Sequence, residues 1–219
     1  MAQIKTSLYE HLHPLTTVMK QHFVENFSGD ALDTDRWASH SSGSFNGAMA
    51  DAVDEGFSMT TQGTSAGHYN KIDFHTSNTV LKRQFNHQGL VGIAVMRMVT
   101  TANNFGAITF SMFDDWYTED GSYIQAVANN YNSTIKHSVR NGSPLTTTSV
   151  TSSTTSTKTW HSYKLETNST TSSFTLDGVL DGVISQIPNE ALCPVLTVAN
   201  AEGTGAQEGR FRYIEAYNT

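Results

Sequence analysis

The residues best suited to chemistry lie in one short acidic segment, residues 114–121. Its four carboxylates and two large aromatic side chains belong to Asp114, Asp115, Glu119, Asp120, Trp116 and Tyr117. Carboxylates crowded in one loop supply the oxygen ligands that calcium prefers, and exposed aromatic rings offer flat apolar surfaces on which a sugar ring can stack. The segment therefore predicts a calcium site at the carboxylates or a ligand platform at Asp114, Asp115, Trp116 and Tyr117. The plainer alternative is an acidic turn whose Trp116 packs on the core.

The other reactive residue types do not form a recognisable motif. The nine histidines include no His-x-x-x-His or His-Glu-x-x-His pair, so a zinc site is not expected. A Ser-His-Asp triad assembled from distant segments stays open. Cys193 lies in an apolar run, which predicts a buried and inert thiol. We therefore expect no catalytic residues and no cofactor other than the calcium ion described above.

The charge of the chain limits the partners it can attract. The formal net charge is −7, from 13 basic and 20 acidic residues, with no basic cluster in the sequence. An acidic chain is repelled by phosphate backbones and by anionic lipid surfaces, so neither nucleic acid nor a membrane is an expected partner. The N-terminal segment lacks the apolar stretch of a secretion signal, which leads us to expect synthesis in a cytoplasm.

The elements that must position these residues are predicted to be β-strands. From residue 19 onward, short apolar runs alternate with Gly, Asn, Asp, Ser and Thr, which is typical of many strands joined by turns. Residues 90–96 are apolar at every position, as in a central strand. We therefore predict one all-β domain over residues 19–219, folded as a two-sheet antiparallel sandwich.

Residues 1–18 differ from this pattern and are predicted to form a short N-terminal arm. Ile4, Leu8 and Leu12 recur every four residues, which places them on one face of a short helix that Pro14 limits. Two interpretations remain open. The arm is either a frayed leader or first strand packed on the sandwich, or a segment whose apolar face docks on a partner through these three residues.

Local signals specify several turns and one edge. Asp177-Gly178 between two apolar runs predicts a tight hairpin, and Asn141-Gly142 predicts another. Asp181-Gly182 follows too soon for a second hairpin and predicts a bulge or bend. The Ser/Thr-rich stretch 146–159 predicts an edge strand followed by a loop.

Four segments together resemble a known family. They are Val24–Trp37, with its Leu-Asp-x-x-x-Trp turn; Trp160–Glu166; the strand–Asp-Gly–strand unit Phe174–Leu180; and the closing strand Arg212–Asn218. In these segments the chain resembles the concanavalin A-like lectin/glucanase domains, including laminin-G-like domains. The resemblance covers roughly residues 19–219 and implies a jelly-roll sandwich.

The resemblance also directs attention to what is missing. Catalytic glucanases of this fold carry Glu-x-Asp-x-Glu on one strand, which places carboxylates on one face for the acid and nucleophile roles. This motif does not occur in the sequence, and neither do the Arg, Gln-x-His and Tyr motifs of alginate-lyase relatives. We therefore expect that the chain is not an enzyme.

The expected function is that of a non-enzymatic virion structural protein. Domains that resemble this one are common in phage particles, as capsid decorations or as fibre-tip adhesion modules. On that basis we expect a homo-oligomer located in the virion, made in the host cytoplasm, whose partners are capsid or tail proteins and cell-surface glycans. Two alternatives remain: a free carbohydrate-binding lectin, and a divergent glycoside hydrolase or polysaccharide lyase.

Overall fold

The computed structural model describes most of the chain from residue 22 onward. The described residues are 22–28, 31–42, 46–49, 56–61, 68–73, 85–99, 106–114, 121–129, 133–141, 146–154, 158–200 and 205–219. Every regular element in them is a β-strand, and within these ranges no helix is long and apolar enough to cross a membrane. The predicted arm, with Ile4, Leu8 and Leu12, lies outside the described residues.

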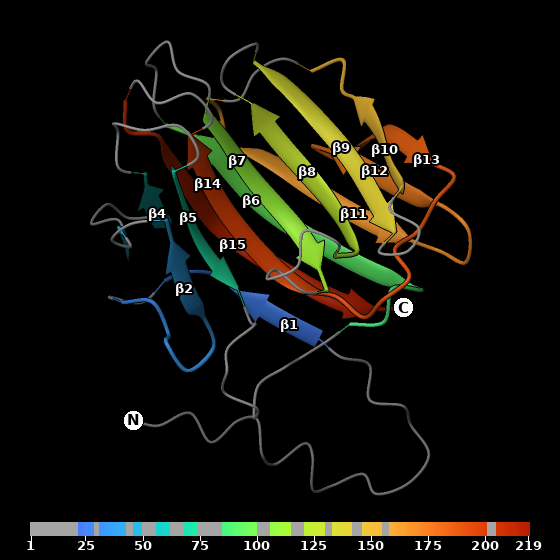
Figure 1. The fold of residues 1–219 in the computed structure, drawn as a ribbon, viewed down its shortest axis with the longest axis horizontal. Coiled ribbons are helices and arrows are strands. Elements are labelled where there is room, and N and C mark those ends of the chain that lie inside the picture. Colours follow the sequence, from blue (N-terminus) through green and yellow to red (C-terminus); the bar gives the residue numbers. More distant parts are fainter. Residues whose placement is uncertain are drawn as a thin grey trace, which may run out of the picture.

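The strands form two antiparallel sheets that pack face to face (Figure 1). One sheet has the order β13 (Val179–Ile184), β12 (Ser172–Leu176), β11 (His161–Thr167), β6 (Leu90–Met98), β15 (Glu208–Asn218), β4 (Phe57–Thr60) and β3 (Gly47–Met49), with β1 (His22–Glu25) also paired to β15. The other has the order β10 (Thr146–Thr151), β9 (Thr134–Asn141), β8 (Tyr123–Asn129), β7 (Gly106–Phe113), β14 (Cys193–Asn200), β5 (His68–Asp73) and β2 (Ala38–Ser41). The predicted two-sheet jelly-roll sandwich is confirmed.

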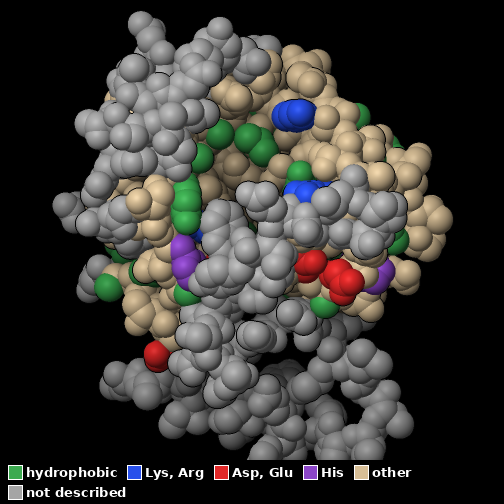
Figure 2. Space-filling model, in the orientation of Figure 1, with side chains coloured by type: hydrophobic (Ala, Val, Ile, Leu, Met, Phe, Trp, Pro, Cys, Tyr) green, Lys and Arg blue, Asp and Glu red, His purple; other side chains and the backbone are tan. Residues whose placement is uncertain are grey.

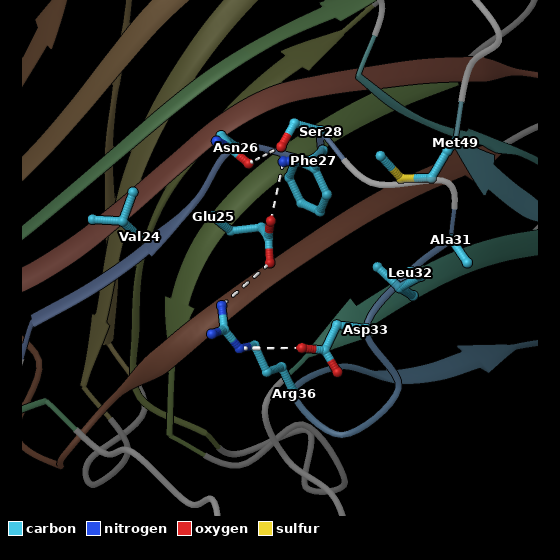
Figure 3. A pocket seen from close by; sticks show the side chains of 10 residues that line it. All are labelled: Val24, Glu25, Asn26, Phe27, Ser28, Ala31, Leu32, Asp33, Arg36 and Met49. Atoms are coloured by element: carbon cyan, nitrogen blue, oxygen red, sulfur yellow. Dashed lines mark hydrogen bonds and ion pairs between the residues drawn. The ribbon is translucent and has the colours of Figure 1, made fainter. Parts of the chain in front are cut away.

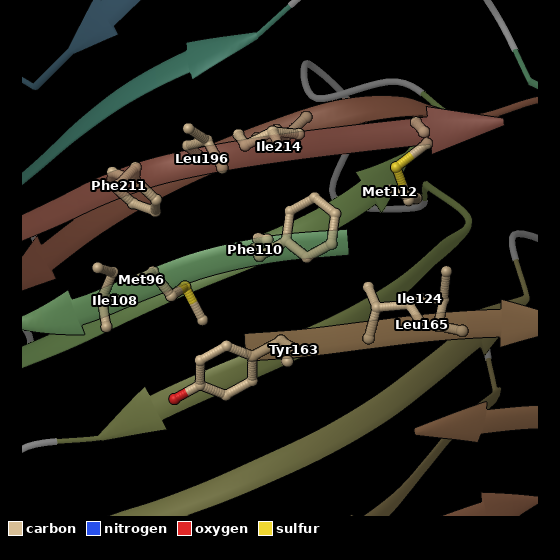
Figure 4. Close-up of a cluster of buried hydrophobic side chains, with 14 of the residues drawn as sticks. Met96, Ile108, Phe110, Met112, Ile124, Tyr163, Leu165, Leu196, Phe211 and Ile214 are labelled. Carbon is tan, nitrogen blue, oxygen red and sulfur yellow. The ribbon is translucent and has the colours of Figure 1, made fainter. Parts of the chain in front are cut away.

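An apolar layer between the sheets holds them together. Along β7 and β8 the buried side chains alternate with half-buried ones, because successive side chains of a strand point to opposite faces. Phe110, Ile124 and Leu196 from the seven-stranded sheet meet Met96 and Ile214 from the eight-stranded sheet in this layer (Figure 4). All five are fully buried. Burial of such side chains is the main favourable term in folding.

The alternation leaves each sheet one face directed away from the core. We call this side of the seven-stranded sheet the open face and that of the eight-stranded sheet the outer face. On the open face of β8 the residues are Tyr123, Gln125, Val127 and Asn129, since Ile124, Ala126 and Ala128 are in the core. These two faces are where side chains not required for packing can serve function.

The local turn signals are confirmed where the structure describes them. Asp177 and Gly178 have φ angles of 50° and 81°, the pair of positive values that a type I′ hairpin turn requires. In the β12–β13 pair, Phe174 lies opposite Gly182 and Thr175 opposite Leu180, so Asp181 is the extra residue of a bulge. Asn141 belongs to β9 and lies opposite Thr146 of β10, so the tight turn predicted at Asn141-Gly142 is not confirmed; residues 142–145 lie outside the described residues. β10 is an edge strand as predicted.

Some strand predictions differ from the structure. β2 and β3 were not predicted, because they are four and three residues long and contain Ser, His and Gly rather than apolar runs. Phe85 lies in no named strand and forms an isolated bridge with Leu192. Cys193 is 2 % exposed, which confirms the buried thiol.

The hairpin turn gives a first testable prediction. A Cβ at Gly178 would touch nothing within 4 Å, so a substitution there changes only the backbone preference. We expect Gly178→Ala to lower the free energy of unfolding by about 1 kcal/mol, because a left-handed conformation is unfavourable for alanine. Urea unfolding measures this change. Ser173→Ala, at an outward position of β12, is the control and should change stability by less than about 0.5 kcal/mol; equal effects would contradict the explanation.

Candidate functional site

A ladder of polar side chains crosses the middle of the open face. Ser111 on β7, Gln125 on β8 and Ser138 on β9 lie in register on neighbouring strands. The Ser111 hydroxyl donates to Gln125 Oε1 over 3.4 Å, and Gln125 Nε2 donates to Ser138 Oγ over 2.9 Å. Both ends of the Gln125 amide are therefore held, which fixes the half-buried Gln125 between two buried serines in the centre of the sheet.

An aromatic pair adjoins one end of this ladder. The rings of Phe113 and Tyr123 stack with their centres 5.4 Å apart and 18° between their planes. Both are half-buried, and Arg140 lies opposite Tyr123 in register. Lys136 lies near the opposite end of β9 from Arg140 and is exposed. Figure 2 shows a hollow lined by hydrophobic and uncharged side chains, with Lys or Arg side chains at two separate places.

On the other side of the open face three titratable side chains meet. Lys71 and Asp73 point to this face from β5, and His40 points to it from the neighbouring edge strand β2, opposite Lys71 in register. Lys71 Nζ lies 2.6 Å from Asp73 Oδ2, and His40 Nε2 lies 3.4 Å from Asp73 Oδ1. Asp73 thus bridges an ammonium and an imidazole. We call these three residues the β5 cluster.

Burial makes this cluster unusual. The side chains of Lys71 and Asp73 are both 0 % exposed, whereas that of His40 is 21 % exposed. Two charges are expensive to remove from water, and their mutual attraction offsets that cost only when they are closely paired. The Lys71–Asp73 pair therefore holds a compensated charge in the interior, and His40 is the member of the cluster that reaches the surface.

The ladder and the cluster lie on one line across the sheet. In register, Gln125 is followed by Ser111, then Val195 on β14, and then Asp73. Three strand spacings of about 4.8 Å separate Gln125 from Asp73, a distance of about 14 Å. Along this line Ser111, Val195 and Asp73 are buried, so His40 is the part of the cluster that a ligand on this face can reach.

Asp73 is the one carboxylate at the outward positions of the open-face strands that the structure describes. Within those strands no Glu-x-Asp-x-Glu array is formed, as expected from the sequence. The open face of β8 carries Tyr123, Gln125 and Val127 at alternate positions instead. The paired-carboxylate chemistry of retaining and inverting glycosidases therefore does not arise from the described open-face strands.

Of the residues predicted to hold calcium or a ligand, only Asp114 is described. It is half-buried directly after β7, and its backbone N–H donates to the carbonyl oxygen of Ser122. Asp115, Trp116, Tyr117, Glu119 and Asp120 lie outside the described residues, so the calcium site and the ligand platform stay predictions. Among described residues, no three His, Cys, Asp or Glu side chains are grouped to hold a metal ion.

A second candidate is a pocket of about 460 Å³ beside β1 (Figure 3). Arg36 lies between two carboxylates there, 3.8 Å from Glu25 Oε2 and 3.2 Å from Asp33 Oδ2. Glu25 also accepts hydrogen bonds from the Phe27 backbone N–H and the Trp37 indole. These contacts hold Phe27 at a φ of 47°. The polar groups of this pocket are engaged with one another, which indicates a structural role.

Two further histidines have carboxylate partners. His161 Nδ1 lies 2.6 Å from Asp177 Oδ2 and its Nε2 lies 2.9 Å from Thr159 Oγ1, an order of contacts like that of a hydrolase triad. Asp177 Oδ1 also accepts the Ser162 backbone N–H, and none of these residues lines the pocket described above. We interpret these hydrogen bonds as structural, because they hold the turn of the β12–β13 hairpin against β11.

His137 is the more deeply buried of these histidines. It is 1 % exposed, stacks on Phe174 with ring centres 4.7 Å apart, and has its Nε2 2.7 Å from Asp181 Oδ2. Burial lowers the pKa of His137 below its usual value, although Asp181 opposes that shift. The pair joins β9 to the bulge of β13, so it links the two sheets.

Sequence reasoning did not identify the β5 cluster. His40 and Asp73 come from strands that are distant in the sequence, β2 and β5. The four-residue strand β2 was not predicted. One signal was available. Lys71 and Asp73 are of opposite charge and stand two apart in the sequence, so on one strand they share one face.

No family pattern and no curated protein sequence matches this chain, but solved structures do. They include an endo-β-galactosidase from Clostridium perfringens that releases GlcNAcα1-4Gal, at 14 % identity and a TM-score of 0.68; it matches 94 % of this chain, which spans 64 % of that enzyme. The Bacillus licheniformis β-glucanase has 14 % identity, a TM-score of 0.65 and coverage of 90 % and 98 %. The endo-β-1,3-glucanase from Pyrococcus furiosus has 11 % identity, a TM-score of 0.63 and coverage of 90 % and 93 %.

These similarities confirm the concanavalin A-like glucanase fold and correct the functional expectation. We predicted a non-enzymatic virion structural protein and no enzyme. That prediction was wrong, because the structures that resemble this chain are enzymes that act on glycosidic bonds, and the alternative of a divergent glycoside hydrolase agrees better with them.

The buried histidine gives a prediction about pH. His137 has a lowered pKa in the folded chain, so below a pH of about 6.5 the unfolded chain binds the proton more readily and stability falls. We expect the free energy of unfolding to drop by at most about 1 kcal/mol between pH 6.5 and 5.5, and His137→Gln to remove that part of the drop. Urea unfolding at both pH values measures it. His22→Gln, at an exposed position, is the control. An unchanged pH dependence in His137→Gln would count against this role.

Proposed function

We propose that this chain is a divergent glycoside hydrolase, which binds a polysaccharide along the open face and cleaves it beside His40. The observation that carries the proposal is the β5 cluster. It combines a buried Lys71–Asp73 pair with a partly exposed histidine, on a face that Figure 2 shows hollowed and lined by hydrophobic and uncharged side chains. The similarity of the fold to glycoside-cleaving enzymes supports the substrate class.

Binding is assigned to the centre of the open face. Sugar hydroxyls are both donors and acceptors, which suits the fixed Ser111–Gln125–Ser138 ladder. The apolar face of a sugar ring suits the half-buried Phe113–Tyr123 pair beside it. The line from this ladder to Asp73 sets the direction in which the polymer would lie.

Catalysis is assigned to proton transfer by His40. In the protonated imidazole, the Nε2–H faces Asp73, and Nδ1–H donates its proton to the glycosidic oxygen as the bond from that oxygen to the anomeric carbon breaks. A water molecule adds to the anomeric carbon and returns a proton to Nδ1. Asp73 acts as the positioning residue that orients the ring, and Lys71 compensates the carboxylate charge.

The test is the release of reducing ends from a panel of polysaccharides. The panel includes β-1,3-glucan, β-1,3-1,4-glucan and galactose-containing glycans, because the similar enzymes are named for these linkages. We expect the intact chain to cleave at least one polymer. His40→Gln should then lower kcat/KM by about 100-fold, which is the usual contribution of a general acid. Asp73→Asn should lower kcat more than it raises KM, because it disturbs ring orientation.

The matched control is Glu166→Gln, a carboxylate on the outer face that is paired with Lys164. It should leave activity unchanged. Because Asp73 is buried, folding of its variant is verified by thermal unfolding, and His40→Gln serves as the second variant if Asp73→Asn does not fold. Full activity in a folded His40→Gln chain, or no cleavage of any polymer by the intact chain, would overturn the proposal.

A further inference from the structure

Three arginines gather on the outer face, on the side of the molecule away from the β5 cluster. Arg97 on β6 lies opposite Arg210 on β15 in register, and Arg212 follows two residues later. This is a local excess of positive charge in a chain with a net charge of −7. We call Arg97, Arg210, Arg212 and the adjacent Trp160 the arginine cluster.

Trp160 brings two of these arginines together. The guanidinium carbon of Arg97 lies 4.8 Å from the centre of the Trp160 ring, and that of Arg212 lies 4.4 Å from it. A cation over an aromatic ring is attracted by it, but two cations at one ring repel each other. A negatively charged group bound between them would offset that repulsion.

A β-bulge directs Arg212 to this place. Phe211 pairs with Met96 and Tyr213 with Val95, so Arg212 is the extra residue between them. Phe211 and Ile214 are in the core, and the bulge leaves both Arg212 and Tyr213 on the outer face. Bulges of this kind are known for re-aiming a side chain at a functional site.

The described carboxylates of the outer face have partners other than Arg212, and one of them, Glu208, neutralises Arg210 within the cluster. Glu208 contacts Arg210 at 2.8 Å, Glu166 contacts Lys164 at 2.7 Å, and Glu215 contacts His22 at 2.8 Å. Glu215 also accepts a hydrogen bond from Tyr213. Arg212 is not a partner in any of these pairs, and its Nε is buried without a hydrogen-bond partner. A buried donor of this kind is costly unless a ligand or water satisfies it.

We propose that the arginine cluster is a binding site for the acidic groups of a sulfated or uronate polysaccharide. A guanidinium that stacks on a ring, as that of Arg212 does, directs its N–H groups outward from its edge, where they match the two oxygens of a carboxylate or sulfate. Trp160 holds the guanidinium groups of Arg97 and Arg212 in place before the ligand binds, which reduces the entropy lost on binding. The site anchors the polymer on the face opposite the one where cleavage is proposed. The choice of a polysaccharide rests on the proposed function, whereas the charge of the ligand rests on the cluster itself.

The test is calorimetric binding to polymers that differ only in charge. The pairs are dextran sulfate with dextran, and polygalacturonate with its methyl ester; they separate sulfate from carboxylate recognition. We expect binding to at least one charged member and none to its neutral partner. Arg212→Gln and Trp160→Leu should each weaken binding by at least about 10-fold, and Arg212→Gln should also lower the dependence of affinity on salt.

Lys164→Gln is the matched control, since it removes a positive charge from the same face outside the cluster. Its affinity should stay within about 2-fold of the intact chain, because exposed pairs contribute little. Equal binding by Arg212→Gln and the intact chain, or tighter binding to single-stranded DNA than to any polysaccharide, would overturn the proposal. The two proposals fail separately. If the chain cleaves no polymer but binds a charged one, this inference stands. If it cleaves a polymer but binds no charged one, the proposed function stands.

Discussion

The apolar layer between the two sheets constrains everything else in this molecule. Every second residue of each central strand is committed to that layer, as Ile124, Ala126 and Ala128 are on β8. A shift of one residue in the pairing would place Gln125 in the core and expose Ile124, so the hydrophobic layer also fixes the register. The positions left for function are those that packing does not use. The polar ladder, the β5 cluster and the arginine cluster all occupy such positions.

The fold was largely predictable because its signals are local. The Asp177-Gly178 turn, the bulge at Asp181 and the Ser/Thr edge strand each follow from a few adjacent residues. The candidate site was not predictable in the same way, because it depends on which strands become neighbours. His40 meets Asp73 only through the pairing of β2 with β5. Residues that are contiguous in sequence, such as the acidic segment 114–121, draw attention more readily than residues brought together by folding.

The functional expectation failed at a specific step. The absence of Glu-x-Asp-x-Glu from the sequence is real, and the described strands of the open face carry no such array. A missing motif excludes one arrangement of acids, however, and says little about other groups that transfer protons. The same face holds an imidazole whose Nε2 lies 3.4 Å from a carboxylate oxygen of Asp73, an arrangement that requires no alternating carboxylates. Conclusions about chemistry therefore need the side chains that lie together in space.

Side-chain contacts join the edge strands β10 and β13 at one edge of the sandwich. Gln186 donates a hydrogen bond to the carbonyl oxygen of Thr146 and accepts one from the Thr148 hydroxyl. Val150 packs closely against Gly182. A Cβ added at Gly182 would lie 2.6 Å from Val150 Cγ2, so the glycine is required for this contact. The edge strands β10 and β13 of the two sheets are thereby joined. Exposed edge strands invite pairing with other chains and lead to aggregation. These contacts link the two edge strands, and we expect their amide hydrogens to exchange with solvent as one cooperative unit.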